Sequence, residues 1–476
     1  MTTTTNEQLK SLPSVSEADR HLEARGLPHG KSVRELVQAV LDGYRRQLLA
    51  GGADEVFSRQ EVLRALEQAV NRPAANQLRR VINCTGVVVH TNLGRAVLPE
   101  TITRPAEALH HSYLNLEFDL DTGQRGPRGG RVPQLLARLA GAEAGLAVNN
   151  NAAAVLLMLT ALGQGREVIV SRGELVEIGG SFRIPDIMRA SGARLVEVGT
   201  TNRTRISDYE QAITENTAAL LKVHRSNFHL SGFVEETGVE ELARLAGALN
   251  REREQPIGVW HDLGSGNFYR FHQPALRNIP TVEAEVRAGA DIVTLSGDKL
   301  LGSAQAGIVV GRAEPLERMR KHPLYRCLRM DRVRTSLLEQ SLLAYLNIDT
   351  LREHNTVIDL LERTPGDMEP LLNAVLKALE PRRGQGLSWE PLRDYSLAGG
   401  GAVPEARIET LCLALWDGAG HRSAQQLAAE LRAGEPPVIV RISGERIIID
   451  FRAVFARDLD LLGQALARLS AGPDSP

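Results

Sequence analysis

Short runs of β-branched and other apolar residues alternate with helical stretches through the middle of the chain, from about residue 80 to residue 312. The runs are AGLAV, REVIVS, ARLVEVG, ALLKVHR, PIGVWHD, DIVTLS and GIVVG. This alternation predicts parallel βαβ units, because two parallel strands need a long crossover connection that a helix usually supplies. We therefore expect an α/β fold with a mixed, mostly parallel central sheet covered by helices on both faces.

The regions on either side of this core have different patterns. The amino-terminal region reads as short helices, marked by three capping-box pairs, Ser14 with Glu17, Ser32 with Glu35, and Ser58 with Glu61. A long helical stretch from Val333 to about Leu361 should lead out of the core, and the hairpin-like PPVIVRISGERIIIDF lies near the end of the chain. The predicted parts are a helical domain (1–72), a large α/β domain (73–335), a linker helix region (336–380) and a small α+β domain (381–476).

Composition excludes several classes of protein. The 56 basic and 58 acidic residues nearly balance, so the overall charge points to neither nucleic acid nor a membrane surface. Cys84, Cys327 and Cys412 are far apart and show no C-x-x-C spacing, which predicts reduced thiols and no metal site. The first residues lack a signal-peptide pattern, and no apolar run approaches the roughly 20 residues of a membrane helix. We expect a cytoplasmic protein.

Three asparagines, Asn149, Asn150 and Asn151, follow the apolar run that ends at Val148 and precede a helical pattern. A helix that begins there would point free N–H groups and its dipole at an anion, so the segment is a candidate phosphate site. The alternative is that an asparagine only caps the helix.

Two ionisable residues stand at the ends of neighbouring predicted strands. Asp262 closes PIGVWH, where a buried carboxylate needs a cationic partner such as a protonated pyridine nitrogen. Lys299 lies in a turn between Gly297 and Gly302, and a partly desolvated lysine can form a Schiff base. Taken singly, each could be an ordinary turn residue. The order of phosphate turn, strand-end aspartate and strand-end lysine resembles the fold-type I pyridoxal 5'-phosphate (PLP) enzymes.

Longer motifs resemble one family more specifically. The chain resembles the bacterial selenocysteine synthase (L-seryl-tRNA(Sec) selenium transferase) family in RVINCTGVVVHTNLGRA, NLEFDLDTGQRGPR, VNNNAAAV, SRGELVEIGGSFRIPDIM, VGTTNRT, VHRSNFHLSGF, HDLGSG, SGDKLLGSAQAGIVVG and HPLYRCLRMD. LPSVSEADRHL near the start and GERIIIDFRAV near the end are also similar to the family. The sequence departs from the family pattern at Arg332, commonly Lys, and at Gly302-Ser303-Ala304, where GGPQ is more usual.

The resemblance implies a PLP-dependent transferase that converts seryl-tRNA(Sec) and selenophosphate into selenocysteinyl-tRNA(Sec), through a PLP-bound aminoacrylyl-tRNA. It also implies that the amino-terminal domain binds the tRNA and that the protein forms a homodecamer, a pentamer of dimers, with no membrane partner. The basic residues of residues 1–72 are interleaved with acidic ones, so composition alone also allows a solvated helix surface.

Residue roles carry over by the same resemblance. Lys299 would hold PLP, Asp262 would pair with the ring nitrogen, and Asp298 would assist proton movement. The further cofactor-binding residues would be Asn150, Asn151 and Ser226. The arginines expected to hold selenophosphate are Arg95, Arg326 and Arg329, with Arg125 or Arg128 as further candidates.

Guanidinium chemistry agrees with the last assignment, because a phosphate-like donor is best held by bidentate, permanently charged groups. Arg326 and Arg329 would share one face if their segment is helical. Each of these arginines could instead be an ordinary ion-paired surface residue.

Two other functions remain open from the sequence. One is a PLP-dependent lyase or aldolase of the same family that acts on a small amino acid or amino sugar. The other is a catalytically silent RNA-binding scaffold, which would carry no cofactor.

Overall fold

The computed structural model describes residues 12–50, 57–71, 78–126, 128–178, 182–225, 228–382, 384, 386–401 and 406–470. The chain divides into two compact units, Met1–Arg80 and Val81–Pro476. None of the helices within the described residues has the length and apolar character needed to span a bilayer.

The first unit is built from the helices α2 (Val15–Ala24), α3 (Arg34–Ala50) and α4 (Arg59–Asn71). Leucines and valines on their facing sides, such as Leu22 and Leu41, form a small apolar core. The capping boxes at Ser14 and Ser58 are confirmed, since each serine exchanges hydrogen bonds with the glutamate three residues later. The third predicted box, Ser32 with Glu35, stays a prediction, because the Ser32 side chain lies outside the part that the structure describes; the backbone ends a short 3-10 turn at Ser32, and α3 begins at Arg34.

A seven-stranded sheet forms the centre of the second unit, and all seven predicted runs contribute a strand. The order across the sheet is β3 (Ala144–Val148), β11 (Gly307–Gly311), β10 (Ile292–Ser296), β9 (Gly258–Gly264), β8 (Thr217–Val223), β4 (Glu167–Ser171) and β7 (Arg194–Val198). Only β11 runs antiparallel to its two neighbours, so the expected mixed, mostly parallel sheet is confirmed.

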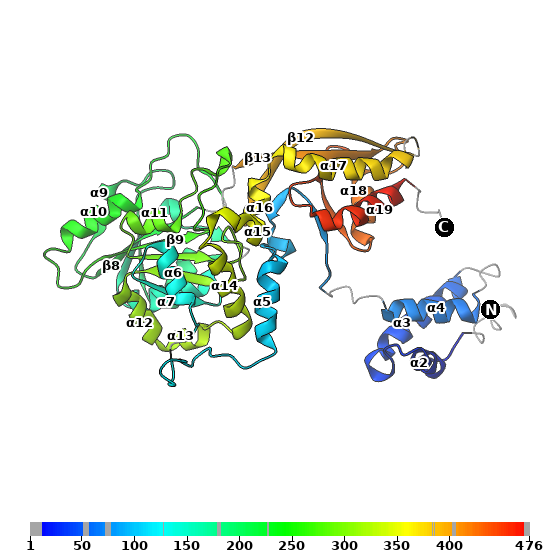
Figure 1. Cartoon of the computed structure of the whole chain (residues 1–476), viewed down its shortest axis with the longest axis horizontal. Coiled ribbons are helices and arrows are strands. Elements are labelled where there is room, and N and C mark those ends of the chain that lie inside the picture. Colours follow the sequence, from blue (N-terminus) through cyan, green and yellow to red (C-terminus); the bar gives the residue numbers. More distant parts are fainter. Residues whose placement is uncertain are drawn as a thin grey trace. The chain divides into compact units, whose positions relative to one another are not determined.

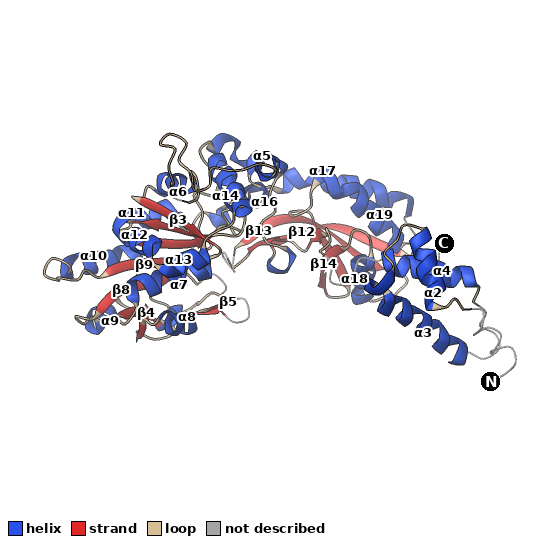
Figure 2. Cartoon of the chain, turned by 90° about the horizontal axis from the view of Figure 1, so that it is seen from below, coloured by secondary structure: helices blue, strands red, loops and turns tan. Residues whose placement is uncertain are grey.

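Helices cover both faces of this sheet (Figures 1 and 2). One face packs against α7 (Asn151–Gly163), α8 (Ile184–Ser191) and α12 (Ala313–Lys321). The other packs against α6 (Val132–Ala140), α10 (Val239–Leu249), α11 (Val282–Arg287) and α14 (Arg332–Ala344). Neighbouring strand residues therefore belong to different cores: Val259 faces α10, and Trp260 faces α7.

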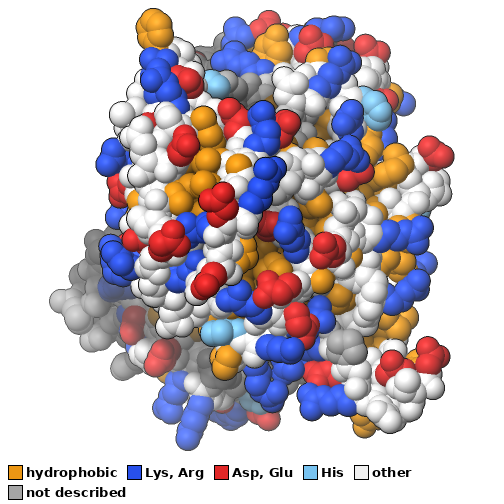
Figure 3. Space-filling view, turned by 90° about the vertical axis from the view of Figure 1, so that its left-hand side faces the viewer, with side chains coloured by type: hydrophobic (Ala, Val, Ile, Leu, Met, Phe, Trp, Pro, Cys, Tyr) orange, Lys and Arg blue, Asp and Glu red, His pale blue; other side chains and the backbone are white. Residues whose placement is uncertain are grey.

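Shorter elements complete the large part of this unit. They are α5 (Glu100–His110), β5 (Glu177–Ile178), β6 (Phe182–Arg183), α9 (Ile206–Ala212) and α13 (Pro323–Leu328). Figure 3 views the chain from the left of Figure 1, where α9 and α10 lie, and shows basic and acidic side chains interspersed over this face. This mixing agrees with the nearly even charge of the chain.

A second, six-stranded sheet has the order β1 (Ile82–Cys84), β14 (Val438–Ser443), β15 (Arg446–Asp450), β13 (Arg407–Asp417), β12 (Leu387–Gly399) and β2 (Val87–Val89). It packs on α17 (Pro365–Leu379), α18 (Ala424–Ala433) and α19 (Leu459–Leu469). The two strands that precede the large α/β part thus pair with carboxyl-terminal strands. The sequence pattern predicted one domain over residues 73–335, which includes β1 and β2. It could not separate these two strands, because a short apolar run does not indicate which sheet it joins.

The stretch predicted to be helical from Val333 to about Leu361 is mostly helical but is not one continuous helix. The chain forms α14, then a 3-10 turn, α15 (Leu351–His354) and α16 (Thr356–Glu362). Asn355 causes one break, because its side chain caps α16 by accepting a hydrogen bond from the Ile358 amide at 3.1 Å. The same side chain donates to the Leu301 carbonyl at 2.8 Å. The residue that interrupts the helix therefore also holds the loop that follows β10.

We predict that Arg452 is essential for stability, because its guanidinium is fully buried and donates to the carbonyls of Leu360, Leu361, Arg363 and Glu409. Arg452→Met leaves these buried acceptors without donors and should lower the free energy of unfolding by about 3 kcal/mol. Urea denaturation followed by circular dichroism measures this. Arg432→Met, on the exposed side of α18, is the control and should change it by less than about 0.5 kcal/mol. Equal stability of both variants would contradict the assignment.

Candidate active site

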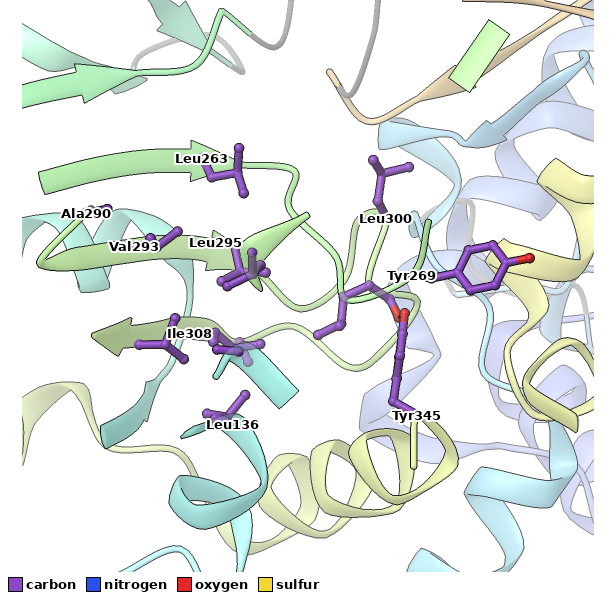
Figure 4. Close-up of a cluster of buried hydrophobic side chains, with 14 of the residues drawn as sticks. Leu136, Leu263, Tyr269, Ala290, Val293, Leu295, Leu300, Ile308 and Tyr345 are labelled. Carbon is purple, nitrogen blue, oxygen red and sulfur yellow. The ribbon is translucent and has the colours of Figure 1, made fainter. Parts of the chain in front are cut away.

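The turn that carries Lys299 is fixed by its glycines and by two buried leucines. A side chain at Gly297 would lie 2.6 Å from the Ala304 carbonyl, and Gly302 has a φ of +72°, which favours glycine. Leu300 and Leu301 are fully buried in the apolar cluster of Figure 4. The chain therefore has little freedom on either side of Lys299.

Hydrogen bonds to the Leu301 carbonyl reinforce this turn. The Tyr345 hydroxyl and the Asn355 amide both donate to it at 2.8 Å. Figure 4 shows Tyr345 reaching from the end of its helix toward the loop. The core on one side of the sheet thus holds the reactive segment in place.

The Lys299 amine is poised as a nucleophile. The residue is only 8% exposed, and burial lowers the pKa of its amine, an effect that Arg95 strengthens and the carboxylates of Asp262 and Asp298 oppose. It forms no ion pair with any carboxylate of the described residues. A lysine with a lowered pKa carries more neutral amine at a given pH than an exposed one, which Schiff-base chemistry requires.

Asp262 lies on β9 directly beside Thr294 of β10 and is 4% exposed. Burial raises the pKa of its carboxyl, although hydrogen bonds and the charge of Lys299 oppose the shift. Asn151 Nδ2 at 2.7 Å and Thr294 Oγ1 at 3.0 Å both donate to Oδ1, which leaves Oδ2 for another donor. A buried carboxylate of this kind fits the protonated ring nitrogen of PLP.

The three asparagines at the start of α7 have three different partners. Asn150 is the N-cap, and its Oδ1 accepts from the Ala153 amide at 2.9 Å. Asn149 accepts from Arg334 at its carbonyl and its side chain, while Asn151 orients Asp262. The amides of Asn151 and Ala152, which precede Ala153 in the first turn, have no partner within the helix, as a bound phosphate would need. No local sequence pattern indicates the contact between Asn151 and Asp262.

Asp298 and Arg95 form an ion pair of 2.7 Å at the same edge of the sheet. Arg95 has a φ of +63° and is the only non-glycine residue of the described chain with a positive φ, so its position is strained. Asp298 Oδ2 accepts from Arg95, whereas Oδ1 is buried without a partner. The pair joins two residues that were predicted separately.

Glu117 organises three of the predicted arginines. Its carboxylate contacts Arg125 at 2.9 Å, Arg128 at 2.6 Å and Arg329 at 3.3 Å. The hydrogen bond from Arg128 contributes most to holding the pKa of Glu117 below its usual value. The motif NLEFDLDTGQRGPR contains Glu117, but a carboxylate among candidate anion-binding arginines was not predicted.

The arginines around Glu117 differ in how many of their guanidinium N–H donors remain without a partner. Arg128 uses Nη1 for Glu117 and both Nε and Nη2 for the Met330 carbonyl. Arg329 pairs through Nη1 only, and its Nε is buried without a partner. An unsatisfied buried donor is the feature that a bound anion would remove.

Arg326 and Arg329 do not share a helical face, so that expectation is wrong. Arg326 lies exposed within α13, whereas Arg329 follows the helix in an extended conformation and forms a β-bridge with Val148. The helix ends because Val148 and Asn149 pair with this segment, the latter through a hydrogen bond to the Leu328 carbonyl. Ser226, another predicted cofactor residue, lies outside the described residues.

Two histidines complete the surroundings of Asp262 and were not assigned a role from the sequence. His261 pairs with Glu285 at 2.9 Å, and its Nε2 is buried without a partner. His224 donates its backbone amide to the Asp262 carbonyl at 2.9 Å, and burial lowers the pKa of its ring to about 4. A histidine with so low a pKa is neutral near pH 7.

The likeness to a solved structure agrees with this geometry. D-glucosaminate-6-phosphate ammonia-lyase superposes with a TM-score of 0.58 and 20% identity, covering 83% of this chain and 96% of that one. The likeness concerns the fold alone, and with it the expected α/β fold of the fold-type I class is confirmed.

Sequence comparison is more specific. The family model described as L-seryl-tRNA selenium transferase matches residues 81–455. The L-seryl-tRNA(Sec) selenium transferase of Nitratidesulfovibrio vulgaris is 42% identical, covering 97% of this chain and 99% of that protein. The protein of the same name from Moorella thermoacetica is 41% identical, with 98% and 97% covered. The chain belongs to the L-seryl-tRNA selenium transferase family.

Proposed function

We propose that this protein is a PLP-dependent transferase that converts L-seryl-tRNA(Sec) into L-selenocysteinyl-tRNA(Sec), with selenophosphate as the selenium donor. One observation carries the proposal beyond the family match. Lys299, with its lowered amine pKa, lies in the turn after β10 and interacts electrostatically with Asp262, a buried carboxylate on the adjacent parallel strand β9 with one oxygen available. Parallel α/β sheets bind ligands at this carboxyl edge.

The residues of the site fit PLP. Lys299 would hold the cofactor aldehyde, Asp262 Oδ2 would accept from the ring nitrogen, and the first-turn amides of α7 would hold the phosphate. Asn150 and Asn151 support these contacts as N-cap and as a donor to Asp262. When bound, PLP supplies an electron sink that acidifies the seryl α-hydrogen and allows the β-hydroxyl to leave.

Asp298 is the residue to which we assign proton exchange. Its Oδ2 is held by Arg95, while its buried Oδ1 has no partner and can take or return a proton. Arg95 thereby fixes the orientation of Asp298 next to Lys299. Part of the positive charge of Arg95 is neutralised in this pair, which makes it a weaker candidate for the donor anion than its sequence motif indicates.

We assign the binding of selenophosphate, the selenium donor, to the arginine cluster around Glu117. Arg125, Arg128 and Arg329 carry three positive charges, and Glu117 carries one negative charge, so a net charge of +2 remains for a phosphate-like dianion. Arg329 offers its free Nε, and the exposed Arg326 supplies a further charge. Arg128 is saturated by Met330 and Glu117, so its role is to position the other groups.

The remaining assignments follow the family. The helical unit within residues 1–72 is proposed to bind the tRNA, and the protein is proposed to act in the cytoplasm as a homodecamer. No observation favours a lyase that acts on a small amino acid or amino sugar, because the likeness to the ammonia-lyase is one of fold.

The function is tested by incubating the enzyme with seryl-tRNA(Sec), with and without selenophosphate, and analysing the attached amino acid. We expect selenocysteine only when selenophosphate is present. Lys299→Ala should remove the visible absorbance of bound PLP and lower the rate by about a thousandfold or more, because the nucleophilic amine is lost. A colourless wild-type protein would instead support the RNA-binding scaffold.

The pH dependence should report the state of Asp262, which must be ionised to pair with the ring nitrogen. Because burial raises its pKa above 3.8, activity should fall as the pH drops toward that raised value. The hydrogen bond from Asn151 lowers the pKa, so Asn151→Ala should raise it and move the acid limb of kcat/KM to higher pH. Thr294→Val should shift the limb in the same direction. An acid limb unchanged in both variants would contradict the role of Asp262.

Glu117→Gln tests the arginine cluster. The variant keeps the size of the side chain but weakens its charge-assisted hydrogen bonds, so the guanidinium groups lose their fixed positions. We expect the KM for selenophosphate to rise about tenfold while the KM for seryl-tRNA stays constant. The control is Glu100→Gln, which removes an exposed ion pair with Arg104 on α5. An equal rise of both KM values would indicate general damage and refute the assignment.

A further inference from the structure

A cavity of about 370 Å³ lies at the edge of the seven-stranded sheet opposite Lys299, where β8 and β9 begin and just before β10. Its walls come from both faces of the sheet, including Leu162 of α7, Ala246 and Gly247 of α10, and Trp260 of β9. None of its lining residues belongs to the candidate active site. A hollow of this size is large enough for a small organic ligand.

Arg166 gives this cavity an uncompensated positive charge. Its Nη2 donates to the Thr217 carbonyl at 2.7 Å, but its Nε is buried without a partner. No carboxylate of the described residues forms an ion pair with it. Burial and the nearby charges of Arg253 and Arg318 lower its pKa, which shows that its surroundings disfavour an isolated cation.

The other charges of the lining are paired. Arg312 contacts Asp291 at 2.8 Å, and Asp291 also accepts from the Val259 amide at 2.7 Å. Arg318 lies 3.7 Å from Glu314, one turn earlier on α12. Three guanidinium groups therefore face two carboxylates, and Arg166 is the group that lacks an anion.

Apart from Asn250 and the charged residues, the side chains of the wall are apolar. Leu162, Ala246, Ile257 and Trp260 are each buried, and they belong to elements packed on opposite faces of the sheet. An apolar wall that includes an indole ring favours a flat, apolar body over a strongly hydrated ion. The charge and the wall together specify an occupant with one anionic group and an aromatic body.

We propose that this cavity is a binding site for a small aromatic carboxylate, with Arg166 as the residue that holds the carboxylate group. The ring of the ligand lies against Trp260 and the small residues of α10. The site is independent of the proposed transferase function, because it shares no residue with the arginine cluster or with the candidate site around Lys299 and Asp262.

Benzoate is a suitable probe, and benzamide is its neutral counterpart of the same shape. Isothermal titration calorimetry on the PLP-loaded enzyme should show saturable benzoate binding, with benzamide at least about tenfold weaker. Arg166→Gln should weaken benzoate binding by about tenfold or more, because the anion loses its charged partner. Arg189→Gln, an exposed arginine of α8 paired with Asp186, is the matched control and should bind benzoate like the wild type.

A second variant fills the cavity without touching its charge. A Cβ atom at Gly247 would meet no atom within 4 Å, so Gly247→Leu places its side chain in free space, and leucine favours a helix more than glycine does. This variant should abolish benzoate binding and retain the wild-type melting temperature. Wild-type affinity in Gly247→Leu, equal affinity for benzamide, or no saturable binding to the wild type would each overturn the proposal.

Discussion

The burial of one carboxylate constrains the rest of the candidate site. Asp262 sits on a central strand where an unpaired charge is costly, and among the described residues only Asn151 and Thr294 donate hydrogen bonds to its carboxylate. Those two donors come from the start of α7 and from the next parallel strand, so the sheet must be assembled before the carboxylate is satisfied. The same assembly brings Lys299 within electrostatic reach of Asp262. Packing of Leu300 and Leu301 on the opposite face then fixes the turn that carries the amine (Figure 4).

Arginines in this protein differ chiefly in whether a carboxylate compensates them. Arg95 is paired with Asp298, and three further arginines gather around Glu117 with a surplus of positive charge. The Glu117 carboxylate holds this cluster together, yet donors such as Arg329 Nε remain without a partner. Arg166 is the contrasting case, since the described residues supply only a backbone carbonyl for it. Arg452 shows that a guanidinium without a carboxylate can also be satisfied by backbone carbonyls, so the absence of a carboxylate does not by itself indicate an anion site; we propose anions as partners only for Arg329 and Arg166.

Local pattern was enough for most of the fold. All seven central strands were predictable because buried parallel strands are short, continuous apolar runs bounded by helices. The break between α14 and α16 was not, since Asn355 acts there through contacts with Leu301, which is distant in sequence. The membership of β1 and β2 in the carboxyl-terminal sheet was equally hidden. Three-residue strands contain too few side chains to indicate their partners.

The sequence by itself determined which chemical groups stand at the ends of the central strands, because the βαβ pattern brings the carboxyl ends of parallel strands to one edge. Lys299, Asp262 and the amides before α7 follow from that rule. Only the tertiary structure decided which groups touch: Asn151 with Asp262 across 111 residues, and Arg95 with Asp298 across 203. These contacts depend on the packing of whole elements, and so does the gathering of three arginines around Glu117. A local pattern specifies the direction of a strand, but not which distant side chain meets its end.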